Sequence, residues 1–69
     1  MGKTTNLQRI RKATGLTQAG LAERSGVSVR LIQDYEQARK PINGAAGRTI
    51  LKLSKALSVR MEDLMEVEK

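Results

Sequence analysis

The chain of 69 residues contains no cysteine, histidine, tryptophan or phenylalanine, and Tyr35 is its only aromatic residue. Without cysteine it can form no disulfide, and without cysteine and histidine it lacks the usual ligands of a zinc site. A hydrophobic core must therefore consist of leucine, isoleucine, valine, methionine and alanine. Because β-sheets favour β-branched and aromatic residues, this composition indicates an all-α fold. We expect neither a metal nor a cofactor.

Long hydrophobic runs are also absent. A membrane-spanning helix needs about 20 mostly apolar residues, and every apolar run in this chain is far shorter. Residues 1–6 are largely polar, unlike the apolar centre of a signal peptide. We therefore expect a cytoplasmic protein. A chain of this length forms one domain, which we assign to residues 1–69, with its core at about 6–65.

Acidic residues are scarce in most of the chain. Thirteen lysine and arginine residues against seven aspartate and glutamate residues give a net charge of +6. Residues 1–60 hold twelve of the basic side chains and three of the acidic ones, whereas residues 61–69 hold one basic and four acidic. A basic body with a short acidic end indicates a polyanionic partner, most simply a nucleic acid. Solubility alone is the alternative explanation of this charge.

Capping residues and the spacing of apolar residues predict a series of short helices. Thr5 and Gln8 match a capping box, and Thr17 and Ser28 are good N-cap residues for the next two helices. Only a short turn with Gly26 separates these two helices, which is typical of a helix-turn-helix motif. The predicted helices cover residues 6–14, 18–24, 29–37 and 46–57, with a shorter fifth helix near 61–65.

The inward faces of these helices predict the core. Gly20 stands inside the second predicted helix, where it costs about 1 kcal/mol relative to alanine. Nothing next to it in the sequence explains this glycine, although the close approach of another helix or of a phosphate would. The predicted core residues are Leu21, Ala22, Ile32, Tyr35, Ile50, Leu53 and Leu57.

A set of residues at fixed spacing runs through the predicted helices. It consists of Leu7, Ile10, Arg11, Gly15, Leu16, Thr17, Gln18, Leu21, Ala22, Gly26, Val27, Ser28, Ile32, Tyr35 and Glu36, followed by the segments 52–59 and 62–64. This pattern resembles the Cro and phage-repressor type of helix-turn-helix protein, the XRE family, over about residues 6–65. The chain departs from the family at Ala38, where many members have glycine, and in the long segment 41–47.

The resemblance implies a compact five-helix, lambda-repressor-like domain whose third helix enters the major groove of DNA. That groove is wide enough for one α-helix. Arg30 can make two hydrogen bonds to guanine, and Val29 can contact a thymine methyl group. Asp34 can accept from cytosine N4 or pair with Arg30 four residues earlier. Val29, Arg30 and Asp34 match the base-reading positions of the family, and Gln33, which lies between them, can also reach the DNA.

The resemblance also assigns positioning roles. Arg11 and Glu36 match an ion pair that holds the first helix to the third, and its loss should destabilise the fold more than the loss of an exposed pair. Contacts to DNA phosphates place the protein without reading the base sequence. The alternative for the loop residues among them is a solvated basic loop. The expected phosphate contacts are Gln18, Ser28, Arg39, Lys40, Asn43 and Arg48.

Three functions remain open at this point. The first is a sequence-specific transcription regulator, associated with the nucleoid, that acts as a homodimeric repressor on a palindromic operator. The second is a DNA-binding antitoxin or accessory subunit whose main role is to bind a protein partner. The third is a nonspecific nucleic-acid binder, against which a single aromatic residue argues because single-strand binding relies on aromatic stacking. The last residues are rich in apolar side chains, at Val59, Met61, Leu64, Met65 and Val67. Some of these must pack on the body of the domain, and the others can form a dimer or partner surface, which we expect among Val59, Met61, Leu64 and Met65.

An enzyme is not expected. General acid–base catalysis needs a histidine, carboxylate, lysine or tyrosine positioned in a concave site. The chain has no histidine or cysteine, and few carboxylates outside residues 61–69. Its length also leaves little room for a pocket.

Overall fold

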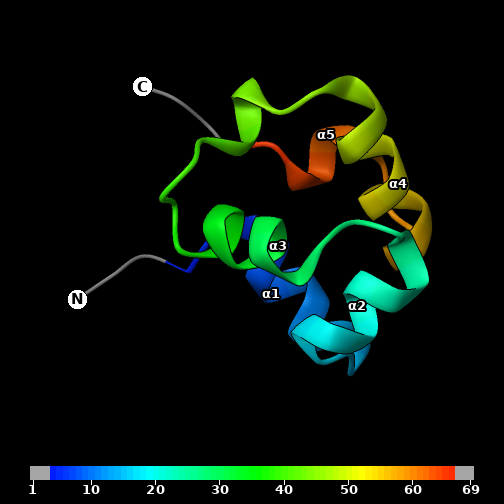
Figure 1. Cartoon of the computed structure of the whole chain (residues 1–69). Coiled ribbons are helices and arrows are strands. Elements are labelled where there is room, and N and C mark those ends of the chain that lie inside the picture. The colour runs from blue at the N-terminus through cyan, green and yellow to red at the C-terminus, as the bar shows by residue number, and fades with distance from the viewer. Residues whose placement is uncertain (1–3, 67–69) are drawn as a thin grey trace.

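Short helices joined by tight turns make up residues 4–66, the part of the chain that the computed structural model describes (Figure 1). This part contains no β-strand, so the prediction of an all-α fold is confirmed. None of its helices is long and apolar enough to cross a membrane. The elements are α1 (Asn6–Thr14), α2 (Gln18–Ser25), α3 (Val29–Glu36), the 3₁₀ turn η1 (Ile42–Gly44), α4 (Gly47–Leu57) and α5 (Met61–Leu64).

The predicted N-cap residues begin the first three helices. The side-chain oxygens of Thr5, Thr17 and Ser28 each accept the backbone N–H three residues later, at distances between 2.9 and 3.3 Å. Such caps replace hydrogen bonds that the first turn of a helix cannot make within itself. Helices α1 and α2 end at Gly15 and Gly26, whose φ angles of +83° and +78° lie in the left-handed region.

Gly20 has a local explanation in the N-cap of its own helix. A Cβ atom on residue 20 would lie 3.1 Å from Thr17 Oγ1 and 3.7 Å from Leu16 Cδ2. The backbone N–H of Gly20 donates to the same Thr17 hydroxyl at 2.9 Å. The glycine therefore leaves room for the N-cap of its own helix.

Helix α3 ends on a non-glycine residue in the left-handed conformation. Gln37 caps the helix, and Ala38 follows with a φ angle of +59°. The N–H of Ala38 donates to the carbonyl oxygen of Tyr35 at 3.2 Å, which closes the last turn. Ala38 thus adopts a conformation that glycine takes without the steric cost of a Cβ atom.

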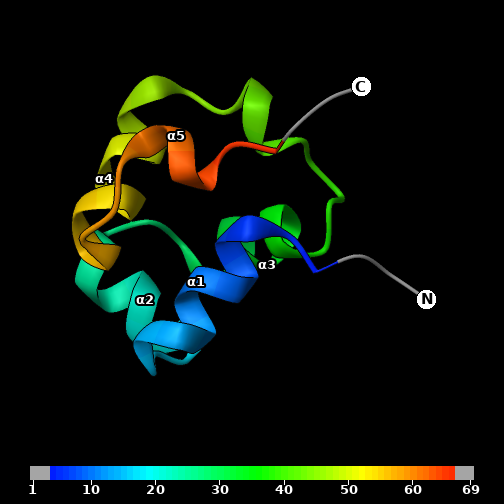
Figure 2. The ribbon, with the colours of Figure 1, turned by 180° about the vertical axis from the view of Figure 1, so that it is seen from behind.

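The core lies where α1, α2, α3 and α4 meet. Helix α1 packs against α3, α4 and α5, and α2 packs against α3 and α4 (Figure 2). Six of the seven predicted core residues are buried, while Ala22 is only partly buried. Leu7, Val27, Ile42 and Leu64 belong to the core although they were not assigned to it. The buried hydrophobic residues are Leu7, Leu21, Val27, Ile32, Tyr35, Ile42, Ile50, Leu53, Leu57 and Leu64.

The buried position of Leu64 corrects the predicted dimer or partner surface. Helix α5 is one turn that packs against α1 and α4, and it buries the Leu64 side chain completely between them. Val59 and Met65 are partly buried against the core, whereas Met61 is exposed. Val67 lies outside the described residues. Leu64 therefore stabilises the fold and is not available to a partner.

Candidate nucleic-acid interface

The first turn of α3 presents its side chains to solvent. Val29 is 39% exposed, and Ser28 and Arg30 are exposed on either side of it. The turn before α3 is short, so α2 and α3 pack directly against each other (Figure 1). In helix-turn-helix complexes, the second helix enters the major groove with such an exposed start while the first helix crosses the DNA backbone.

A buried ion pair holds α3 from the inside. Arg11 Nε donates to Glu36 Oε2 at 2.5 Å, and Arg11 Nη2 donates to Glu36 Oε1 at 3.0 Å. Both side chains are almost completely buried. Arg11 Nη1 also donates to the carbonyl oxygen of Leu16 at 2.8 Å. The structure therefore brings the two predicted partners together, and their paired, charge-assisted hydrogen bonds fix α1 against the last turn of α3.

Gln18 and Gln33 extend this network toward the surface. Gln18 Nε2 donates to Glu36 Oε1 at 3.0 Å, and Gln33 Nε2 donates to Gln18 Oε1 at 3.4 Å. Because the Glu36 carboxylate can only accept, it determines which end of the Gln18 amide faces it. Both glutamines are half-buried at the junction of α2 and α3. Hydrogen bonds within the protein thus hold both side chains in place in the absence of DNA.

Asp34 lies differently from the other residues that were predicted to read bases. Its side chain is only 11% exposed, with Oδ1 3.6 Å from Arg39 Nη1 and Oδ2 3.9 Å from Lys40 Nζ. The ion-pair partners of Asp34 are therefore in the loop after α3, in place of the predicted Arg30. The reason is that this loop folds back on the helix, since the N–H of Arg39 donates to the carbonyl oxygen of Asp34 at 2.8 Å.

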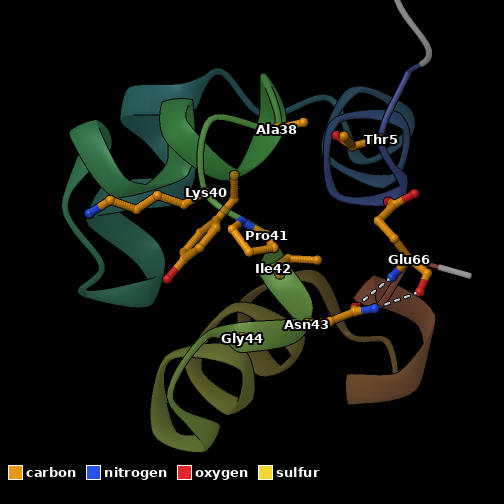
Figure 3. Close-up of a pocket in the computed structure, with 9 residues that line it drawn as sticks. Thr5, Ala38, Lys40, Pro41, Ile42, Asn43, Gly44 and Glu66 are labelled. Carbon is orange, nitrogen blue, oxygen red and sulfur yellow. Dashed lines mark hydrogen bonds between the residues drawn. The ribbon is translucent and has the colours of Figure 1, made fainter. Parts of the chain in front are cut away.

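The remaining predicted phosphate contacts lie on other elements. Arg48 is exposed in the first turn of α4. Asn43 belongs to η1, where its Nδ2 donates to the carbonyl oxygen of Glu66 at 2.8 Å and its Oδ1 accepts the N–H of Glu66 at 2.9 Å. Figure 3 shows these two hydrogen bonds beside a pocket of about 530 Å³, lined mainly by residues 38 and 40–44 and by Glu66. The role that the structure shows for Asn43 is therefore to hold the loop to Glu66.

Comparison with known proteins shows which protein family has this arrangement of helices. The model of a helix-turn-helix family matches residues 7–64, which run from α1 to the end of α5. The chain is a helix-turn-helix protein of the Cro and phage-repressor type. The helix-turn-helix protein is accordingly a DNA-binding transcriptional regulator and not an enzyme.

A solved structure shares the fold of this helix-turn-helix protein. It is the restriction-modification controller protein C.AhdI from Aeromonas hydrophila. The two chains are 30% identical and superpose with a TM-score of 0.76, over 87% of this chain and 86% of that chain. The similarity thus extends over most of both chains. None of the curated proteins compared with this chain matches it.

Proposed function

We propose that this helix-turn-helix protein is a sequence-specific regulator of transcription that reads duplex DNA with α3. The observation that carries the proposal is the exposed first turn of α3, held from the inside by the buried ion pair to α1. Arg30 presents donors to guanine O6 and N7, and Val29 presents methyl groups to thymine. Gln33, whose amide is held by Gln18, lies one turn further along the same helix.

Phosphate contacts flank this reading surface in the proposal. The side-chain amide of Gln18 is held by Glu36 and Gln33, so its contact is through the backbone N–H groups at the start of α2, where the helix dipole also favours an anion. We leave Asn43 out of the interface because its amide is hydrogen-bonded to Glu66 on both sides. The proposed phosphate contacts are Gln18, Ser28, Arg39, Lys40 and Arg48.

We further propose that the protein binds an inverted repeat as a homodimer. The recognition helices of such dimers lie one DNA turn apart, at about 34 Å, whereas the described residues measure 31 × 26 × 20 Å. One copy therefore cannot place a helix in two successive turns of the major groove. Leu51 on α4 and Met61 on α5 are large apolar side chains that are 42% and 37% exposed. With the partly buried Val59 and Met65, they form the proposed dimer surface.

The likeness to C.AhdI supports a more specific biological role. That protein is a restriction-modification controller, and the similarity extends over most of both chains. We therefore propose that this protein represses transcription of genes in a system of the same kind. The DNA sequence that it prefers should then occur beside such genes, and a reporter gene placed downstream of that sequence should lose expression when the protein is present.

Selection of bound duplexes from a random DNA pool tests the proposal directly. At about 150 mM salt, nonspecific binding is weakened and sequence-specific binding dominates the selection. We expect enrichment of an inverted repeat with half-sites about ten base pairs apart. Binding that is sensitive to salt but enriches no sequence would contradict the proposal.

The exposed Leu51 and Met61 also favour a second candidate function. The same surface would suit a DNA-binding antitoxin or accessory subunit, whose main role is to hold a protein partner. Capture from a lysate of the source cells would then recover one protein in equal amount to the bait. Leu51→Lys and Met61→Lys should abolish that capture, whereas Lys55→Ala, on an exposed polar position of α4, should not.

A further inference from the structure

We propose that Asp34 holds the side chains of Arg39 and Lys40 and thereby limits binding to DNA of arbitrary sequence. This inference rests on the proposed function, because it concerns the way in which α3 and the following loop meet a duplex. In this proposal Asp34 does not contact a base. It positions the two cations of the loop, and this makes binding more selective for the correct DNA sequence.

The contacts of Asp34 reach the loop through both its side chain and its main chain. Each carboxylate oxygen faces one cation, at 3.6 Å from Arg39 Nη1 and 3.9 Å from Lys40 Nζ. The main-chain carbonyl oxygen accepts the N–H groups of the same two residues, at 2.8 and 3.3 Å. The main-chain contacts hold the start of the loop against the end of α3, and the carboxylate lies beside both of its cations.

The exposure of the three side chains shows which of them can meet DNA. The Asp34 side chain is only 11% exposed, whereas the side chains of Arg39 and Lys40 are both 59% exposed. The carboxylate thus lies beneath the two cations with both oxygens turned toward them. A carboxylate that is this little exposed is poorly placed to accept a hydrogen from cytosine N4, but its charge acts on the two cations beside it.

A negative charge next to phosphate-binding cations has two effects on binding. It opposes the attraction of the loop for any phosphate, and it keeps each cation near one position. Ion pairs with such exposed partners are weak, so a well-placed phosphate can still draw the cations away from Asp34. In a poorly fitted complex, where phosphates do not lie opposite the loop, the cations stay with Asp34. The carboxylate therefore weakens nonspecific binding most.

The test measures binding to a 20-base-pair duplex of random sequence by fluorescence anisotropy between about 50 and 200 mM salt. Four proteins are compared: the natural chain, Asp34→Asn, the double variant Arg39→Ala with Lys40→Ala, and the triple variant. We expect Asp34→Asn to lower Kd by about three- to tenfold, the effect of releasing two weak ion pairs. The salt slope should become steeper by about one to two.

Glu62→Gln is the matched control. It changes the net charge by the same amount and frees Arg60 from an exposed ion pair at 3.5 Å, but it lies on α5. We expect its effect on Kd to be clearly smaller than that of Asp34→Asn. In the double-variant background, Asp34→Asn should have no more effect than this control, because no loop cations remain to be released.

Three outcomes would overturn the inference. The first is an effect of Asp34→Asn no larger than that of Glu62→Gln. The second is an effect that persists at full size without Arg39 and Lys40, which would mean that Asp34 acts on phosphates directly. The third is a changed base preference at one position with unchanged affinity for random DNA, which would mean that Asp34 reads a base.

Folding and the proposed function are tested separately. Thermal melting of every variant shows whether it folds, and Asp34→Ser offers a second neutral side chain if Asp34→Asn does not. If the proposed sequence specificity fails, the natural chain selects no sequence from a random pool. The comparison on random duplexes still decides the role of Asp34 in that case, so the two failures are distinguishable.

Discussion

At the scale of single residues, Ala38 carries backbone strain that a substitution can remove. Its φ angle of +59° places the Cβ atom close to the following carbonyl group, at a cost of about 1–2 kcal/mol. Ala38→Gly removes this strain, and the greater freedom of glycine in the unfolded chain offsets part of the gain. We expect a net stabilisation of about 0.5–1 kcal/mol. Thermal melting should show it as a rise of roughly 2–8 °C.

The control for this prediction is the same substitution in ordinary helical backbone. Ala13 is exposed within α1, and Ala13→Gly should lower stability by about 1 kcal/mol. A fall in melting temperature for both variants would contradict the assigned conformation of Ala38.

The buried pair between Arg11 and Glu36 makes a second prediction at this scale. Arg11→Met leaves a carboxylate without its main partner in the interior, which costs about 3–5 kcal/mol. That is a large part of the stability of a small domain. Urea denaturation followed by circular dichroism measures the loss. Adding Glu36→Leu should recover much of it, because two apolar side chains can pack where the ion pair stood. A single variant within about 1 kcal/mol of the natural chain would contradict this account.

Some side-chain partners could be predicted from the sequence and others could not. Arg11 and Glu36 were paired from the family resemblance, and the structure joins them. Asp34 was assigned a partner by helical spacing, but its partners lie in a loop whose path depends on tertiary contacts. Glu66 was not singled out, although its carboxylate accepts the N–H of Asn6 at 2.6 Å. The two residues lie at opposite ends of the described chain, and no local pattern in the sequence connects them.

At the scale of elements, the N-cap of α2 decides how the helix-turn-helix unit begins. Thr17 Oγ1 accepts the N–H of Gly20 at 2.9 Å. Thr17→Ala removes this bond and should destabilise the protein by about 1 kcal/mol, measured by urea denaturation. Thr4→Ala, an exposed threonine just before α1 that caps no helix, serves as the control and should have little effect. Equal stability of the two variants would show that the cap contributes nothing.

The helices were easier to predict than the segments between them. Their limits depend on local signals, and residues 6–14 were predicted as the structure has them, while the other limits differ by about one residue. The 3₁₀ turn η1 was not predicted as a helix, because Ile42 is fixed by burial in the core and not by a local pattern. Helix α5 has one turn, so the periodicity there was too short to show that Leu64 points inward.

At the scale of the whole molecule, the proposed dimer surface can be tested without DNA. Sedimentation of the natural chain at rising concentration should show a monomer converting to a dimer. Leu51→Lys and Met61→Lys place a charge on exposed apolar positions and should shift this conversion to higher concentration. Because both side chains are exposed, the melting temperature of the monomer should change little. Lys52→Ala, next to Leu51 on an exposed position of α4, is the control.

A dimer that is unaffected by both lysine variants would place the interface elsewhere. Met61 was expected on this surface from the sequence and Leu51 was not, because an apolar residue on an amphipathic helix is expected to face the core. The exposure of Leu51 depends on how α4 packs against the other helices, which the sequence pattern of α4 does not show. The surface therefore depends on the whole fold and not on α4 or α5 alone.

The central claim is that α3 reads base pairs, and selection with an altered α3 tests it most directly. The random-pool selection is repeated with Arg30→Ala and, as a control, with Lys52→Ala. A bidentate contact to guanine contributes about 1–3 kcal/mol of discrimination. We predict that Arg30→Ala loses the preference for one base pair in each half-site and keeps the rest of the inverted repeat, while Lys52→Ala selects the natural sequence. Identical sequences selected by the natural chain and by Arg30→Ala would contradict the account, because α3 would then not read the DNA through Arg30.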